Sequence, residues 1–432
     1  MLQGFRAEIL IVAQDPARFG PEAIRHHADG LLVVEDGEVA AVGAHAALID
    51  GFPGLSVRTY PGKLICAGFV DTHVHYPQVD RMAAHGSQLL DWLERHIFPA
   101  ELAFADPAHA ARTSAFFLDE MLRNGTTSAL VYGTVHAGSI DALFEQALAR
   151  GMRIVAGKVL MDCNAPPDLC DTPQSGRAES EALIARWRGR GRLGYAVTPR
   201  FALTSSDAQL AGAGAMLEAH PDVYLHTHLA ENPAEIAAVA DRFPQAADYL
   251  DVYDRFGLVG RRSVFAHAIH LDDRAMGRMG QAGASIAFCP SSNLFLGSGL
   301  FDLALADRHG VGVSLGTDIG AGLSFSLLHA VGEAYKVCQM RGCSLDPFRA
   351  LYLATAAGAR RLGCGVLAPG DAADFVVLDP AATPLLARRT AGADIAETLF
   401  ALQMLGDDRC VAETYVAGVR RYARDADLEP AP

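Results

Sequence analysis

Two histidines one residue apart, His73 and His75, end an apolar stretch early in the chain. Side chains alternate between the two faces of a β-strand, so both imidazoles would lie on the same face. Neutral imidazole is a common zinc ligand, and the pair could therefore supply half of a metal site. The alternative is a pair of polar residues at the end of a strand, and the rest of the chain decides between the two.

Further potential metal ligands lie within or directly after three later apolar stretches. His226 and His228 stand in one stretch, His267 ends the next, and Asp318 follows the last. Each has an ordinary explanation by itself, because a single histidine is more often part of a core and an aspartate after a strand often caps a helix. Four such positions at the ends of four strands favour a common site.

The residue types suit a metal centre that activates water. The expected ligands of a single zinc ion are three imidazoles and one carboxylate: His73, His75, His228 and Asp318. Such a set leaves a position open for water, which loses its proton near neutrality and becomes a nucleophile. His226 is the less favoured ligand, because alternation along the strand places it one layer deeper than His228.

Three residues are the expected catalytic groups: Glu231, His267 and Asp318. Glu231 stands three residues after His228 and could carry a proton between water, a ring nitrogen of the substrate and the leaving group. His267 would hold the attacking oxygen, although it could instead be a metal ligand. Asp318 could accept a hydrogen bond from the attacking water and orient it.

Eight apolar segments of strand length alternate with helical patterns over the middle of the chain. The expected strands are residues 69–75, 127–132, 153–160, 193–198, 223–229, 263–268, 284–288 and 312–316. Helices are expected at 107–123, 139–149, 180–187, 206–218, 272–281 and 301–307. This α/β alternation predicts a (β/α)8 barrel, or TIM barrel, whose functional residues lie at the carboxyl ends of the strands. A doubly wound parallel sheet is the alternative.

Both ends of the chain have β character. Residues 31–34 and 39–43 flank an Asp-Gly turn at Asp36, which is a strong hairpin signal. After a helical stretch at 345–361, extended segments return at 374–378 and 411–418. We expect the two ends to form one small β-sandwich, with domains at 1–66 (first part of the sandwich), 67–365 (catalytic barrel) and 366–432 (second part).

Composition excludes several classes of protein. The chain has 432 residues and a net charge of −14, which argues against nucleic acid and anionic membrane surfaces as partners. We expect neither a secretory signal nor a membrane span. The eight cysteines contain no Cys-x-x-Cys pair, which is typical of reduced thiols in a cytoplasmic protein and excludes the small zinc deaminases with a Pro-Cys-x-x-Cys motif.

Several motifs resemble those of one family. Pro61-Gly62 and the segment 67–75 resemble the first-strand signature of the amidohydrolase superfamily. Residues 367–378 resemble the return of that superfamily's chain into its terminal β-sandwich. Within the superfamily, four further segments resemble the guanine deaminase family: residues 75–78, 88–93, 157–162 and 198–202.

The resemblance implies a purine base as substrate and hydrolysis of guanine to xanthine and ammonia, by attack of a metal-bound hydroxide on C2. In that family the positions of Gln78, Arg200 and Phe201 contact the purine, and His228 and Asp318 border the same pocket. Arginine can donate to both O6 and N7 of guanine, while an amide both donates and accepts. One zinc ion per subunit and a homodimer are also implied.

Two residues qualify this resemblance. Cys163 stands where many relatives have a basic residue, so the contribution of its loop is open. Lys158 lies within its expected strand, short of the carboxyl end, so a carboxylated lysine that bridges two metals is not expected.

Other functions remain possible for the same residues. Another amidohydrolase acting on 8-oxoguanine, cytosine, an adenosine-type compound or a triazine would share the metal ligands and differ in the pocket. A non-catalytic scaffold member of the superfamily would be expected to lack ligands, whereas all four positions and Glu231 are filled here. Metal analysis of the purified protein separates these two classes.

Overall fold

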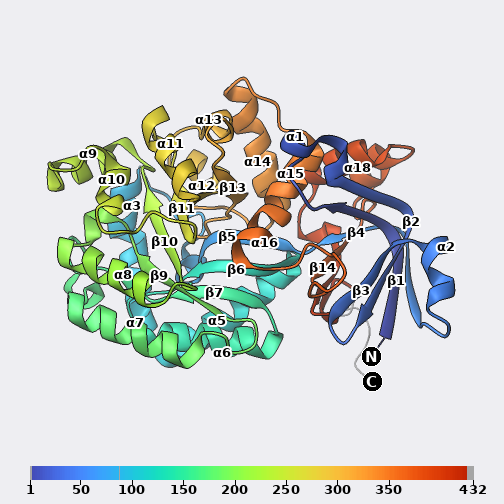
Figure 1. The fold of residues 1–432 in the computed structure, drawn as a ribbon, viewed down its shortest axis with the longest axis horizontal. Helices are drawn as coiled ribbons and strands as arrows, with labels where there is room; N and C mark the ends of the chain where they lie inside the picture. The colour runs from blue at the N-terminus through green and yellow to red at the C-terminus, as the bar shows by residue number, and fades with distance from the viewer. Residues whose placement is uncertain (1, 87, 426–432) are drawn as a thin grey trace.

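The computed structural model describes residues 2–86 and 88–425, and its centre is a barrel of eight parallel strands. The strands are β5 (Phe69–His75), β6 (Thr126–Tyr132), β7 (Arg153–Gly157), β9 (Gly194–Pro199), β10 (Tyr224–Leu229), β11 (Ser263–His267), β12 (Ser285–Phe288) and β13 (Gly312–Leu315). They pair in chain order, and the first and last meet where the Asp318 N–H donates to the carbonyl of His73 at 2.9 Å. Figure 1 shows the helices surrounding them. The predicted (β/α)8 barrel is confirmed.

One predicted strand is broken in two. Residues 153–160 form β7 and the short β8 (Val159–Leu160), with Lys158 between them. The backbone of β9 approaches so closely that a Cβ on Gly157 would lie 1.8 Å from the carbonyl oxygen of Ala196. Only glycine fits this approach, and β8 then resumes the pairing with β9 in the same register as β7.

The predicted helices are present, with shifts of a few residues at most ends. α5 (Pro107–Arg123) has the predicted bounds, because Asp106 caps its first turn by accepting the N–H of Ala108. The others are α6 (Ala137–Arg150), α7 (Pro173–Trp187), α8 (Asp207–Ala219), α11 (Asp273–Ala282) and α13 (Leu303–Arg308). The stretch predicted as helical at 345–361 is two helices, α15 (Pro347–Ala354) and α16 (Ala356–Leu362), because Thr355 has a non-helical ψ of −90°.

Further helices were not predicted. They are α1 (Pro16–Phe19), α2 (His45–Leu48), α3 (Leu89–Trp92), α4 (Phe98–Leu102), α9 (Pro233–Arg242), α10 (Tyr249–Asp254), α12 (Pro290–Phe295), α14 (Leu327–Met340), α17 (Pro384–Thr390) and α18 (Ile395–Leu405). Most are short, so a helical period has little length in which to show. Over the described ranges, no helix has the length and apolar character needed to cross a membrane.

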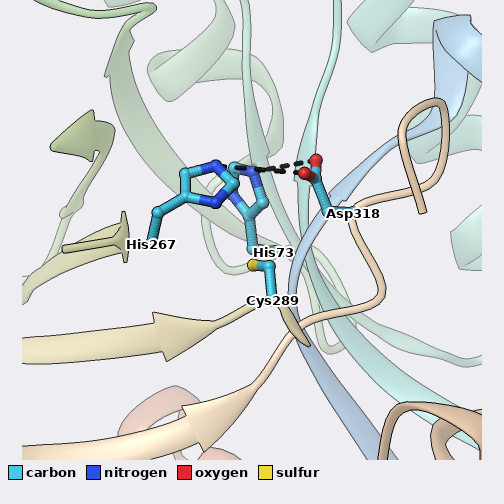
Figure 2. A group of neighbouring side chains, drawn as sticks. All are labelled: His73, His267, Cys289 and Asp318. Carbon is cyan, nitrogen blue, oxygen red and sulfur yellow. Dashed lines mark ion pairs between the residues drawn. The ribbon is translucent and has the colours of Figure 1, made fainter. Parts of the chain in front are cut away.

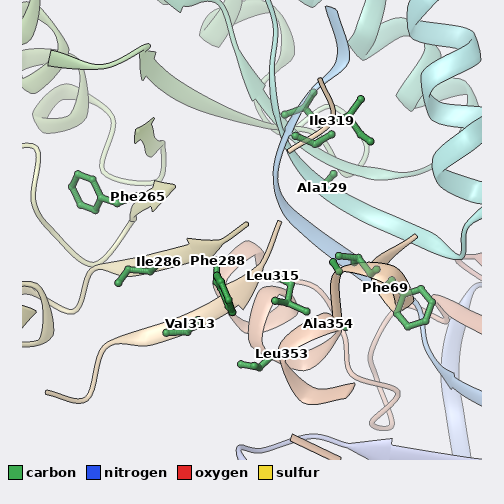
Figure 3. Packing of buried hydrophobic residues seen from close by; sticks show 14 of the residues in the cluster. Phe69, Ala129, Phe265, Ile286, Phe288, Val313, Leu315, Ile319, Leu353 and Ala354 are labelled. Atoms are coloured by element: carbon green, nitrogen blue, oxygen red, sulfur yellow. The ribbon is translucent and has the colours of Figure 1, made fainter. Parts of the chain in front are cut away.

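Apolar side chains fill the barrel wall and its floor. In Figure 3, Val313 and Leu315 of β13 lie against Leu353 and Ala354 of α15, and all four are buried. The floor beneath the strand ends is a separate buried layer that includes Val70, Leu130, Val155, Ala196, Tyr224, Val264 and Ala287, with Ala359 and Leu362 of α16 below them. This packed floor fixes the strands that carry the polar residues above it.

The two ends of the chain form one seven-stranded sheet. Its order is β16 (Val419–Ala423), β15 (Val411–Val416), β14 (Phe375–Leu378), β4 (Val57–Ala67), β1 (Leu2–Val12), β2 (Ile24–Glu35) and β3 (Glu38–Ala44). The predicted hairpin joins β2 to β3, with positive φ at Asp36 (50°) and Gly37 (90°).

This sheet folds over its own apolar core. β1 and β15 are separated by β4 and β14, so in a flat sheet they would be about 14 Å apart. The rings of Phe5 and Tyr415 are nevertheless 5.1 Å apart. The two termini thus combine as predicted, and the facing layers of the expected sandwich come from a single continuous sheet. The domain boundaries at 1–66, 67–365 and 366–432 stay predictions.

An ion pair between Arg192 and Asp374 joins the barrel to the terminal sheet. Arg192 Nη1 donates to Asp374 Oδ1 at 2.8 Å, its Nη2 donates to the other oxygen, and the same Oδ1 accepts the N–H of Ala417 at 2.8 Å. Only 5% of the Asp374 side chain is exposed. This carboxylate therefore connects three segments that are distant in sequence.

We predict that Asp374→Asn destabilises the fold by about 2 kcal/mol, because the largely buried Arg192 loses its counter-charge. Urea unfolding followed by circular dichroism measures the change. The matched control is Asp29→Asn, in the exposed pair with Arg6, which should have little effect. Equal shifts of the unfolding midpoint in both variants would contradict the prediction.

Candidate metal centre and active site

Four side chains from three strand ends converge on one point. His75 Nε2 lies 3.2 Å from both His73 Nε2 and His228 Nε2. Asp318 Oδ1 lies 3.2 Å from His73 Nε2 and 3.4 Å from His75 Nε2. Zinc–nitrogen bonds of about 2.0–2.1 Å in a tetrahedron place neighbouring ligand atoms about 3.3 Å apart, so the donor set and its spacing fit such an ion.

The electrostatics of these groups favour the protonation states that a metal needs. Burial lowers the pKa of His73, His75 and His228, which keeps the imidazoles neutral. Burial alone would raise the pKa of Asp318, but the adjacent histidines hold this pKa well below its ordinary value, and His73 has the largest effect among them. Neutral imidazoles beside a charged carboxylate are the form that binds a cation.

Outer hydrogen bonds orient two of the rings. His228 Nδ1 lies 2.7 Å from the carbonyl of Arg200, which can only accept, so Nδ1 carries the proton and Nε2 presents its lone pair. His73 Nδ1 lies 2.7 Å from His226 Nε2. His226 is thus below the converging atoms, one layer deeper on β10 than His228, as the alternation of the strand predicts.

His267 is a further histidine near Asp318. Figure 2 shows the two side chains facing one another with His73 and Cys289 beside them. Its Nδ1 is fixed by Asn293 Oδ1 at 2.8 Å, and its Nε2 lies 3.9 Å from Asp318 Oδ2. Burial lowers the pKa of His267, but the carboxylates of Glu231 and Asp318 outweigh it and the net shift is upward. Nε2 makes no hydrogen bond to another described residue, so it is free to hold a reacting oxygen or a metal.

Glu231 is a buried carboxyl group able to exchange a proton near neutrality. Burial raises its pKa to about 7, and Oε2 lies 3.5 Å from His267 Nε2. Its backbone is held by Glu235, whose Oε2 accepts the N–H groups of Glu231 and Asn232 at 2.9 and 3.1 Å. Ser298 Oγ donates to Glu231 Oε1 at 3.2 Å. These contacts place a general acid or base next to the converging ligands.

The strand ends adopt unusual backbone conformations here. Ala230, His267 and Asp318 have φ values of 48°, 68° and 52°, in the left-handed region that residues other than glycine rarely occupy. Such strain is maintained only where surrounding contacts determine it, and it concentrates at functional sites. It turns His267 and Asp318 towards the shared point.

A cavity opens directly onto this group. Its lining comprises His75, Gln78, Leu89, Trp92, Leu93, Arg200, Phe201, His228, Glu231, His267, Leu296, Asp318 and Ala321. The three residues expected to contact a purine, Gln78, Arg200 and Phe201, are therefore together on its wall. A Cβ on Gly320 would lie 2.1 Å from Gln78 Oε1, so this glycine leaves the space that the amide occupies.

Several residues of the site were not predicted. Glu101 of α4 accepts hydrogen bonds from Arg200 Nη1 at 2.8 Å and from Gln78 Nε2 at 3.3 Å. Asn293, Ser298 and Glu235 hold His267 and Glu231, as described above. No local pattern marks Glu101, Asn293 or Ser298, because each acts through a contact distant in sequence. Glu235 is the exception, since Asn232 and Glu235 have the spacing of a helix capping box.

Lys158 and Cys163, which qualified the resemblance, do not line the cavity. Lys158 Nζ lies 2.9 Å from both oxygens of Asp171 and 2.5 Å from Glu179 Oε2. Cys163 Sγ lies 3.0 Å from Arg242 Nη2. The lysine is thus held by two carboxylates away from the converging ligands.

A sequence profile of the Amidohydrolase family matches residues 64–421, most of the chain. The chain is 49% identical over 409 residues to the guanine deaminase of Escherichia coli (strain K12), with 93% of each protein covered. A solved structure of E. coli guanine deaminase matches with a TM-score of 0.95 at 47% identity, covering 98% of this chain and 100% of that one. One from C. acetobutylicum, with guanine bound in its active site, matches with a TM-score of 0.91 at 27% identity and the same coverage. The chain belongs to the amidohydrolase family and, within it, to the guanine deaminase family.

We predict that His75→Ala weakens metal binding by more than about 100-fold, because it removes one of the converging donors. Loss of an outer hydrogen-bond partner typically costs 10–100-fold, so His226→Gln should retain much more metal. Elemental analysis after dialysis against a weak chelator measures both. Full metal content in His75→Ala, or equal losses in the two variants, would contradict the ligand assignment.

Proposed function

We propose that this protein is a zinc-dependent guanine deaminase that releases xanthine and ammonia. The observation that carries the proposal is that two groups of side chains meet: His75, His228 and Asp318, three of the four converging residues, line the cavity that also holds Gln78 and Arg200. The family match and the named relatives support guanine as the base. The assignment of zinc rests on the donor set of three imidazoles and one carboxylate.

The side chains of the site have two tasks, which are to bind the base and to transfer protons. Arg200 and Gln78 would bind the O6 and N7 edge of guanine, and the ring of Phe201 would pack against the base. This pose presents C2 and its amino group to the converging ligands. When bound, the metal ion would lower the pKa of a water molecule so that it can attack as hydroxide.

Proton transfers are the task of the buried carboxyl groups. Asp318 accepts a hydrogen bond from the attacking water and orients it, while His267 stabilises the oxygen through Nε2. Glu231 takes one proton of the attacking water and delivers it to the ring nitrogen, then takes the proton of the new C2 hydroxyl and delivers it to the departing amino group, a role that suits a carboxyl with a pKa of about 7. Ammonia leaves and the C2 oxygen becomes the new carbonyl of xanthine.

A homodimer and a cytoplasmic location are further proposals. The homodimer rests on the family resemblance alone. The location is supported by all eight cysteines being free thiols.

We predict that Glu231→Gln lowers kcat for ammonia release from guanine by on the order of 10²–10⁴-fold, because the proton carrier is lost. The bound metal should remain at wild-type content, since Glu231 is not among the four expected ligands. Coupled detection of ammonia and elemental analysis give the two quantities.

The control for this variant is Glu218→Gln on α8, an exposed residue that should leave both quantities unchanged. Substantial ammonia release by Glu231→Gln would contradict the assigned role. Loss of metal together with activity would instead make Glu231 a determinant of metal binding.

A further inference from the structure

Arg200, on the cavity wall, forms a buried ion pair with Glu101. Both carboxylate oxygens of Glu101 lie 2.8 Å from Arg200 Nη1, and the side chains of Glu101 and Arg200 are 0% and 3% exposed. The ring of Phe98, on the same helix as Glu101, lies 5.7 Å from Arg200 Cζ. Helix α4 therefore supplies both a charge and an aromatic face to one guanidinium group.

This arrangement uses only part of the donor capacity of Arg200. A guanidinium group has five N–H donors, and Nη1 provides the two that face Glu101. Within the described part of the chain, Nε and Nη2 donate to no protein acceptor. They are also absent from the fully buried polar atoms that lack a hydrogen-bond partner. The free edge of Arg200 therefore faces the cavity that it lines, while Glu101 fixes the opposite edge.

Glu101 also fixes the amide of Gln78. Gln78 Nε2 donates to Glu101 Oε1 at 3.3 Å, which uses one of its two N–H groups and leaves the other N–H and the amide oxygen for a ligand. A single carboxylate thereby sets both the orientation and the net charge of the pair that would bind the base.

We propose that Glu101 determines the charge preference of this cavity: by neutralising Arg200, it makes the site select a neutral purine and reject an anionic one. The inference rests on the proposed function. Guanine is uncharged near neutral pH, whereas xanthine has an additional acidic N–H and ionises more readily. The same charge balance that admits the substrate would thus expel the anionic form of the product.

The surrounding charges reinforce this preference. Across the cavity from Arg200 lie the carboxyl groups of Glu231 and Asp318 and the imidazoles of His75, His228 and His267. Burial and then the Lys158 ammonium lower the pKa of His136, while the Glu101 carboxylate acts in the opposite direction. Without Glu101, the Arg200 cation on the cavity wall would have no counter-charge and would attract an anion.

The first test uses the wild-type holoenzyme and xanthine as inhibitor. Its inhibition constant against guanine should rise with pH as xanthine ionises, because the anion binds more weakly than the neutral form. A constant that stays level or falls contradicts the proposal, and this arm requires no variant. Binding of xanthine followed by calorimetry over the same pH range gives the same quantity without turnover.

The second test compares Glu101→Gln with the wild type. Glutamine preserves the shape and an acceptor oxygen but removes the charge, so anionic xanthine should bind about tenfold more tightly than to the wild type. Glu231 and the histidines are common to both proteins, so their own titration cancels in the comparison. In Glu101→Gln combined with Arg200→Gln this gain should disappear, because the cation that attracts the anion is also removed.

The matched control is Glu413→Gln, another largely buried carboxyl paired with arginines, located in the terminal sheet. It should leave the pH profile of xanthine binding unchanged. If Glu101→Gln lowers turnover but shows the wild-type pH profile, Glu101 is a purely structural residue and the proposal is wrong. If the wild type does not deaminate guanine, the proposed function fails, while the calorimetric comparison of neutral and anionic purines still tests the charge preference.

Discussion

The closure of the barrel by a hydrogen bond from the Asp318 N–H to the His73 carbonyl is the constraint on which the site depends. This 2.9 Å bond joins the carboxyl end of the first strand to Asp318, three residues after the last strand ends at Leu315. Asp71 reinforces the junction, since its Oδ1 accepts the N–H groups of His73 at 3.2 Å and Thr317 at 3.1 Å. Residues 245 positions apart in sequence are thereby fixed with their ligand atoms 3.2 Å apart.

Arg200 connects the converging histidines to the cavity, because its backbone carbonyl contacts His228 and its side chain lines the cavity. Its carbonyl accepts the proton of His228 Nδ1 at 2.7 Å, and its guanidinium group lies on the cavity wall, held by Glu101. A displacement of Arg200 would therefore change both the ring orientation of an expected metal ligand and the recognition of the base. This coupling through one residue joins the candidate metal centre and the cavity into one site.

The sequence was sufficient to predict the parts of this structure that repeat or stand in a fixed local order. The strand pattern predicted all eight barrel strands, and the position of the histidines at strand ends predicted which side chains meet. The break at Lys158 was not predictable, because it results from the approach of Ala196 on a neighbouring strand. Short helices such as α10 and α12 have too few residues to show a helical period. The folding of the terminal sheet over itself shows only in contacts distant in sequence, such as that of the Phe5 and Tyr415 rings.

The residues that support the site escaped prediction for a similar reason. Glu101 is an unremarkable glutamate in a five-residue helix, and its importance lies only in its contact with Arg200, 99 residues away. Asn293 and Ser298 likewise act on His267 and Glu231 from another loop. Motifs therefore indicated which residues are proposed to do the chemistry, and the structure was needed to identify those that hold them in place.

The central claim is that the metal centre and the cavity act together on guanine. A spectrophotometric screen of the metal-loaded protein against guanine, other aminopurines, aminopyrimidines and triazines tests it most directly, with ammonia measured in parallel. The account predicts that guanine is the preferred substrate, with one xanthine and one ammonia formed per guanine consumed. Preference for a pyrimidine or triazine, or the absence of ammonia release from guanine, would contradict it.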